Sequence, residues 1–156
     1  MGANILLSVI LGLTLQSHVP NAVQTGHVVS APTTKQQLET LVNVKTLAMA
    51  TMMFGADNND VMPKASDTKG VFAKIKPYLK SLDSTKSLNP KSSVLFNFAV
   101  NGVRGANVKL PAQTVLFYES KGWANGRRAV AFCDGHAKLI SAMEWAKISK
   151  DVRGKP

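Results

Sequence analysis

The sequence predicts an α+β fold in which an N-terminal amphipathic helix packs on a small antiparallel sheet. Apolar residues first recur three and four positions apart and later form short runs bounded by Gly, Pro or Asn, which is typical of a helix followed by strands. The chain has 156 residues, of which 45 % are hydrophobic and 18 % charged, enough to bury one core. Its single cysteine excludes an intramolecular disulfide framework.

The first 34 residues are expected to lie outside this core. Residues 5–15 read ILLSVILGLTL, an uncharged stretch that is shorter than the ~20 apolar residues needed to span a bilayer. We therefore expect residues 1–22 to be a signal-like targeting segment, with an uncleaved membrane tether or a buried helix as alternatives. Residues 23–34 have no apolar period and are expected to form a linker. The globular domain is then expected over residues 35–150, followed by a polar tail over residues 151–156.

The first helix is expected from Lys35 to about Ala56. Thr34 and Gln37 have the spacing of a capping box, and Gly55 supplies a stop signal. One helical face is continuously apolar, and we expect it to be buried, with its methionines filling the core. This face consists of Leu38, Leu41, Val42, Ala48, Met49, Met52 and Met53.

The remaining elements follow from shorter patterns. Residues 57–63, DNNDVMP, are expected to form a turn, although an oxygen-rich cation loop is an alternative. A second helix is expected over residues 70–82, bent at Pro77, and a short closing helix over residues 141–150. Asp134 and Gly135 predict a hairpin with a type I′ turn. Strands are expected at residues 94–100, 114–119, 129–133 and 137–140.

Two stretches together resemble the pilin-like proteins, or pseudopilins, of type II secretion and type IV pilus ancestry. Residues 43–63, NVKTLAMATMMFGADNNDVMP, look like the family's helix end with its Asp-Asn-Asn turn and Pro. Residues 110–140, LPAQTVLFYESKGWANGRRAVAFCDGHAKLI, look like its Pro-x-x-Thr-Val-Leu strand and closing Asp-Gly-His hairpin. Ala124 stands where the C-terminal His-x9-Asp-Gly signature of one class has its histidine, and Ser17 where the prepilin leader has its Glu.

The resemblance implies a non-enzymatic, exported protein of the cell envelope. It would act through contacts with other envelope or pilin-like subunits in a type II secretion or type IV pilus-like assembly. Trp123 and Trp145 are the expected partner contacts if they are exposed. The sequence offers no evident small-molecule substrate.

A cation site, with calcium as the candidate ion, is one hypothesis for the closing hairpin. Asp134 and His136 flank Gly135, and the resemblance places the strand that carries Glu119 nearby. The alternative is that Asp134 only shapes the turn and His136 is an exposed strand residue. Cys133 is expected to be a core thiol rather than a nucleophile, because no residue is evident to orient the imidazole of His136.

The net charge of +10 suggests a second function class, the binding of polyanions such as DNA or surface polymers. The cations are mostly lysines scattered singly along the chain, which favours a solvated surface instead. The expected polyanion-binding residues are Lys74, Lys76, Lys80, Arg127 and Arg128.

Overall fold

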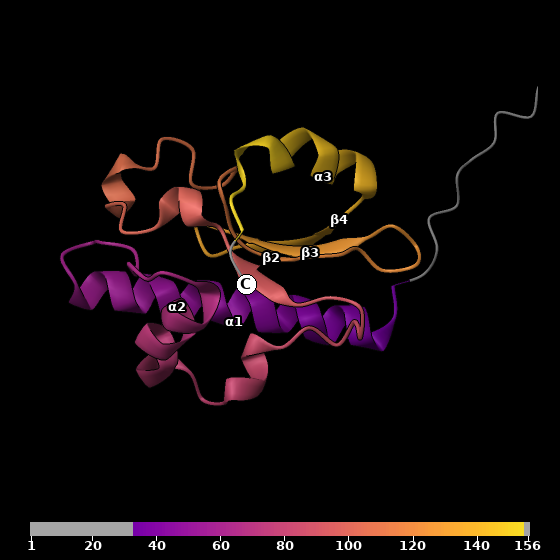
Figure 1. Cartoon of the computed structure of the whole chain (residues 1–156), viewed down its shortest axis with the longest axis horizontal. Coiled ribbons are helices and arrows are strands. Elements are labelled where there is room, and N and C mark those ends of the chain that lie inside the picture. Colours follow the sequence, from indigo (N-terminus) through magenta and orange to yellow (C-terminus); the bar gives the residue numbers. More distant parts are fainter. Residues whose placement is uncertain (1–32, 155–156) are drawn as a thin grey trace, which may run out of the picture.

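The computed structural model describes residues 33–154, so the expected targeting segment and most of the expected linker lie outside the described residues. The helices are α1 (Lys35–Asp57), α2 (Thr68–Ile75) and α3 (Ala142–Ile148). The strands are β1 (Val94–Phe96), β2 (Val115–Glu119), β3 (Arg128–Phe132) and β4 (Ala137–Ile140). They form one antiparallel sheet in the order β1-β2-β3-β4. The expected α+β class is confirmed, and Figure 1 shows the sheet between α1 below and α3 above.

Helix α1 begins and ends as the sequence predicts. The Thr34 side chain accepts a hydrogen bond from the Gln37 backbone, and the Gln37 side chain accepts one from the Thr34 backbone, which completes the capping box. At the other end, the backbone N–H groups of Asn58 and Asp60 both donate to the carbonyl oxygen of Gly55. Asn59 and Asp60 have positive φ, so the chain turns sharply there, as the expected turn requires.

The face of α1 that packs on the sheet differs from the expected one. Val44, Leu47, Ala48 and Ala50 are buried where α1 packs on β2, β3 and β4, together with polar residues of the helix. The expectation that the methionines fill the core is wrong. The large side chains of the core, such as Phe96 and Phe117, come from the sheet, so the helix contributes small side chains that let it approach closely. Five large apolar side chains remain 41–61 % exposed and are called the α1 apolar stripe: Leu38, Val42, Met49, Met52 and Met53.

The second helical segment is shorter than expected and begins earlier. Asp67 caps α2 by accepting a hydrogen bond of 2.7 Å from the backbone N–H of Gly70. The α-helix ends at Ile75, and a 3₁₀ turn containing Pro77 follows over Lys76–Tyr78. Pro lacks the N–H that a continued α-helix would use, so the expected extension to residue 82 is wrong.

Two details of the sheet also differ from expectation. β1 stops at Phe96 because the Asn97 side chain accepts a hydrogen bond from the N–H of Ala99 and starts a 3₁₀ turn. In the β3–β4 hairpin Gly135 has a positive φ of 88° but Asp134 does not, so the expected type I′ turn is wrong. The N–H of Gly135 donates to Phe132 instead, which fits a three-residue turn with a glycine bulge.

The second face of the sheet is covered by the C-terminal segment. Trp145, Ile148 and Val152 pack against a buried cluster that includes Tyr118 and Phe132. The chain then continues along β1: the N–H of Arg153 donates to the Asn97 side chain, and its carbonyl oxygen accepts from Phe98. The expectation of a polar tail is therefore wrong for residues 151–154, which are part of the packed domain.

Candidate functional site

Glu119 lies fully buried at the end of β2, where its carboxylate joins three parts of the chain. Oε1 accepts a hydrogen bond of 2.5 Å from the Ser87 hydroxyl. Oε2 accepts from the indole N–H of Trp123 and from the backbone N–H of Ala129, both at 2.8 Å. These donors satisfy the carboxylate within the protein, so Glu119 is a structural anchor for the loop before β1 and the loop after β2.

The three expected cation ligands do not form one site. Glu119 contacts Ala129 in the first half of β3, whereas Asp134 and His136 lie in the turn beyond its end. Within residues 33–154, no group of three His, Cys, Asp or Glu side chains is placed to hold a metal ion. The sequence did not indicate that Glu119 is engaged by Ser87 and Trp123, because these contacts form only when the loops fold back on the sheet.

Asp134 and His136 instead pair with each other on the hairpin. Their side chains are joined by a contact of 2.6 Å between Nδ1 and Oδ1, and the imidazole stacks on Phe132 at 4.3 Å between ring centroids. Burial raises the pKa of Asp134, but hydrogen bonds from His136 outweigh this and hold the pKa below its usual value. Asp134 shapes the turn, as the alternative interpretation expected, whereas His136 is a half-buried turn residue and not the expected exposed strand residue.

Cys133 is buried on the face of the sheet that packs against α1. Burial, assisted by the charge of Asp134, raises the pKa of its thiol to about 12. The His136 ring stacks on Phe132, whose side chain belongs to the cluster on the opposite face of the sheet. Cys133 is therefore the core thiol that the sequence predicts, without an imidazole base beside it.

The two tryptophans are packing residues rather than exposed contacts. Trp123 is half-buried, and its indole N–H is held by Glu119. Trp145 is half-buried between Tyr118, on which it stacks, and the Arg128 guanidinium, which lies 4.3 Å from the ring centroid. Both indoles have these internal roles, and their role as partner contacts stays a prediction.

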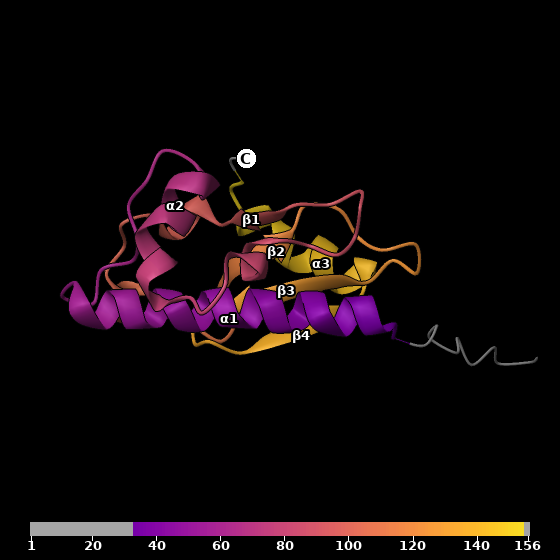
Figure 2. The same ribbon diagram turned by 90° about the horizontal axis from the view of Figure 1, so that it is seen from below.

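The expected basic residues fall into two separate groups. The loop before Arg127 contacts the start of α1 through a hydrogen bond between Asn125 and Gln37, whereas Tyr78 contacts Asp57 at its end. Twenty residues of helix, roughly 30 Å, lie between these two contacts. Figure 2 shows α2 near one end of α1 and the β2–β3 loop near the other. The group at the end of α2 and just after it consists of Lys74, Lys76 and Lys80, all exposed.

The two arginines of the other group are used inside the fold. Arg127 donates a hydrogen bond of 2.5 Å to the Thr33 hydroxyl. Arg128 donates to the backbone carbonyl of Glu119 and packs on Trp145; burial lowers its pKa, and the charge of Glu119 opposes this shift. The five residues therefore do not make one polyanion-binding patch.

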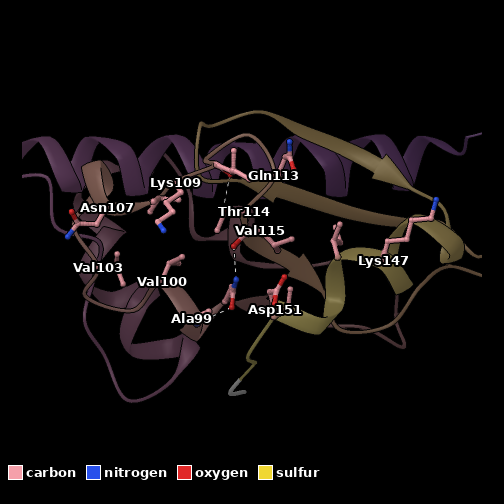
Figure 3. A pocket seen from close by; sticks show the side chains of 15 residues that line it. Ala99, Val100, Val103, Asn107, Lys109, Gln113, Thr114, Val115, Lys147 and Asp151 are labelled. Carbon is pink, nitrogen blue, oxygen red and sulfur yellow. Dashed lines mark hydrogen bonds between the residues drawn. The ribbon is translucent and has the colours of Figure 1, made fainter.

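An open groove of about 460 Å³ lies between α3 and the loop that joins β1 to β2. Figure 3 shows Val100, Val103 and Val115 along it, with Lys109 and Lys147 contributed from the loop and from α3. The hydroxyl of Thr114, which also lines the groove, donates to the backbone of Leu110. The groove's lining contains no pairing of a nucleophile with a base.

The α1 apolar stripe is the main exposed feature of the helix. At 3.6 residues per turn, its five side chains fall within about 100° around the axis. The sequence contained a signal for it: Thr40, Val44, Thr51 and Gly55 recur at helical spacing and mark a second, narrower face, the one that is buried. No helix within residues 33–154 is long and apolar enough to cross a membrane.

Comparison of the chain with protein-family models, with curated proteins and with solved structures finds no match in any of the three.

Proposed function

We propose that the protein is a pseudopilin-like structural component of the cell envelope that acts by contacting other pilin-like or envelope subunits. The observation that carries this proposal is the α1 apolar stripe. Large apolar side chains gathered on one side of a helix favour association, because binding a partner removes them from water. Three of the five are methionines, whose flexible side chains adapt to a partner surface.

The arrangement of the domain supports the proposal. A long helix on an antiparallel sheet is the fold class that the resemblance implies, and the packing leaves one side of α1 open. The uncharged residues 5–15 agree with export to the envelope. The assembly would be of the type II secretion or type IV pilus-like kind.

A lysine that lies among the stripe residues indicates the chemistry of the partner surface. Lys45 is exposed and falls at the centre of the stripe, between Val42 and Met49. A buried lysine is costly unless it is paired. The partner surface should therefore be apolar with a carboxylate opposite Lys45.

Copurification from native cells tests the proposal. The full chain carries Val42→Glu in one variant and Gln36→Glu in the other, which adds the same charge at an exposed position on another side of α1. We expect wild type and Gln36→Glu to retain an envelope subunit that Val42→Glu loses, with circular dichroism unchanged in all three. A wild-type protein without an envelope partner, or a Val42→Glu variant that keeps it, would contradict the proposal.

Polyanion binding is the second candidate function. It is favoured by the exposure of Lys74, Lys76 and Lys80, which form no ion pair within residues 33–154. DNA binding followed by fluorescence anisotropy should then weaken steeply as salt rises, and more gently after these lysines are changed to Gln. Changing Lys147 to Gln, on the opposite layer of the fold, is the control. Absence of binding at low salt would remove this candidate.

A further inference from the structure

Sulfur atoms gather where α1 passes the β3–β4 turn, the two elements that lie side by side in Figure 2. The Sδ atoms of Met52 and Met49 lie 2.7 and 3.2 Å from the point that a Cβ on Gly135 would occupy. Both thioethers therefore face the same glycine, which leaves room for them by having no side chain.

A pocket of about 310 Å³ lies beside this point and is lined by Met52 and by Asp134, the neighbour of Gly135. Met52 lines it together with Met62 and Cys133, which are 7 % and 6 % exposed. Cys133 is a free thiol, and within residues 33–154 its side chain has no hydrogen-bond partner. The carboxylate-bearing residues Asp60 and Asp134 also line the pocket.

We propose that this pocket binds a soft monovalent metal ion of the Cu(I) class, with Cys133, Met52 and Met62 as ligands and Met49 as an additional thioether. Thiolate and thioether sulfur select soft ions such as Cu(I), whereas calcium prefers oxygen. On binding, Cys133 releases its proton to water and its sulfur coordinates the ion. No electron is transferred, because copper enters and stays as Cu(I).

The exposure of two of the methionines distinguishes this site from ordinary core packing. Met52 and Met49 are 41 % and 46 % exposed, so they remain accessible to an incoming ion, while Met62 and Cys133 lie just inside. A flexible thioether at the mouth can rotate onto an ion held by the buried sulfurs. The site shares Met49 and Met52 with the α1 apolar stripe, at the end of the stripe next to Gly135, but binding of the ion to the isolated protein needs no partner subunit.

An anaerobic competition titration tests the site. The full-length, reduced protein is titrated with Cu(I) in the presence of a chromophoric Cu(I) chelator at pH 7. We expect the wild-type protein to take one equivalent of Cu(I) from the chelator. Met52→Leu, Met62→Leu and Cys133→Ser should each weaken Cu(I) binding by about tenfold or more. Met53→Leu and Met143→Leu are the matched controls, since both residues are exposed methionines outside the pocket, and both should bind as wild type does.

Thermal unfolding distinguishes a variant that loses metal binding from one that fails to fold. Ag(I) is a redox-inert probe of the same class of ion. It should raise the Tm of wild type and of Met53→Leu but not that of Cys133→Ser. Cooperative unfolding of Cys133→Ser without metal shows that this variant is folded. The proposal is overturned if wild type withholds no Cu(I), if the double variant Met52→Leu/Cys133→Ser binds as tightly as wild type, or if the control variants weaken equally.

Discussion

The indole N–H of Trp123 donates a hydrogen bond of 2.8 Å to the buried carboxylate of Glu119. Ser87 and the backbone of Ala129 donate to the same carboxylate. Through these bonds one side chain connects the loop before β1, the loop after β2 and the first half of β3. Burial of this carboxylate is tolerated because three donors from the protein satisfy it.

Glu119→Gln should destabilise the domain by roughly 2–3 kcal/mol, because the amide turns an NH₂ group toward donors that the carboxylate accepts. The free energy of unfolding in urea measures this. Glu39→Gln is the control: its exposed i,i+4 pair with Lys35 should cost no more than about 0.5 kcal/mol. Equal losses in the two variants would contradict the anchoring role of Glu119.

Gly135→Ala should destabilise the domain by about 1–2 kcal/mol, because its φ of 88° is costly for a residue with a Cβ. The new methyl would also meet the Met52 sulfur at 2.7 Å. Gly55→Ala, in the interior of α1 with no atom within 4 Å of its added Cβ, should instead stabilise by up to about 1 kcal/mol. Thermal unfolding of the two variants should therefore shift in opposite directions; a shared direction would refute this account of the turn.

The two tyrosines should both titrate above their ordinary pKa of 10.0. A hydrogen bond of 2.7 Å to Asp57, with burial and the Asp57 charge, raises the pKa of Tyr78. Burial raises the pKa of Tyr118, although the charge of Arg128 opposes it. Phenolate absorbance should show Asp57→Asn lowering the pKa of Tyr78, with Glu39→Gln as an unchanged control.

The raised tyrosine pKa values also determine how the free energy of unfolding changes at alkaline pH. The folded state keeps these protons at pH values where the unfolded chain releases them, so the free energy of unfolding should fall as pH rises above about 10. Tyr118→Phe should make this fall less steep. A folded protein in which either tyrosine titrates at or below 10 would contradict the described contacts.

Local signals predicted the elements well because they depend on neighbours in sequence. The capping pair Thr34 and Gln37 sets the start of α1, and the helix ends at Asp57, two residues after Gly55. Non-local contacts decided the rest. Which side of α1 is buried depends on the bulk of the facing sheet, and the role of Glu119 depends on Ser87, 32 residues away.

The candidate site was less predictable for the same reason. Asp134, Gly135 and His136 were correctly placed in a hairpin, but the turn type depends on how Phe132 pairs across it. No local sequence pattern predicts that Trp123 contacts Glu119 or that Trp145 packs on Arg128. The methionines were recognised at helical spacing, yet the sequence did not reveal that Met49 and Met52 face a glycine of a distant turn.

The most direct test of the proposed function is photo-crosslinking in native cells from the α1 apolar stripe. A photoreactive residue replaces Val42 in one strain and Gln36, exposed on another side of the same helix, in a second. We expect a crosslink from position 42 to an envelope or pilin-like subunit, identified by mass spectrometry, and none from position 36. Uncrosslinked monomer at position 42, or the same products from both positions, would contradict it.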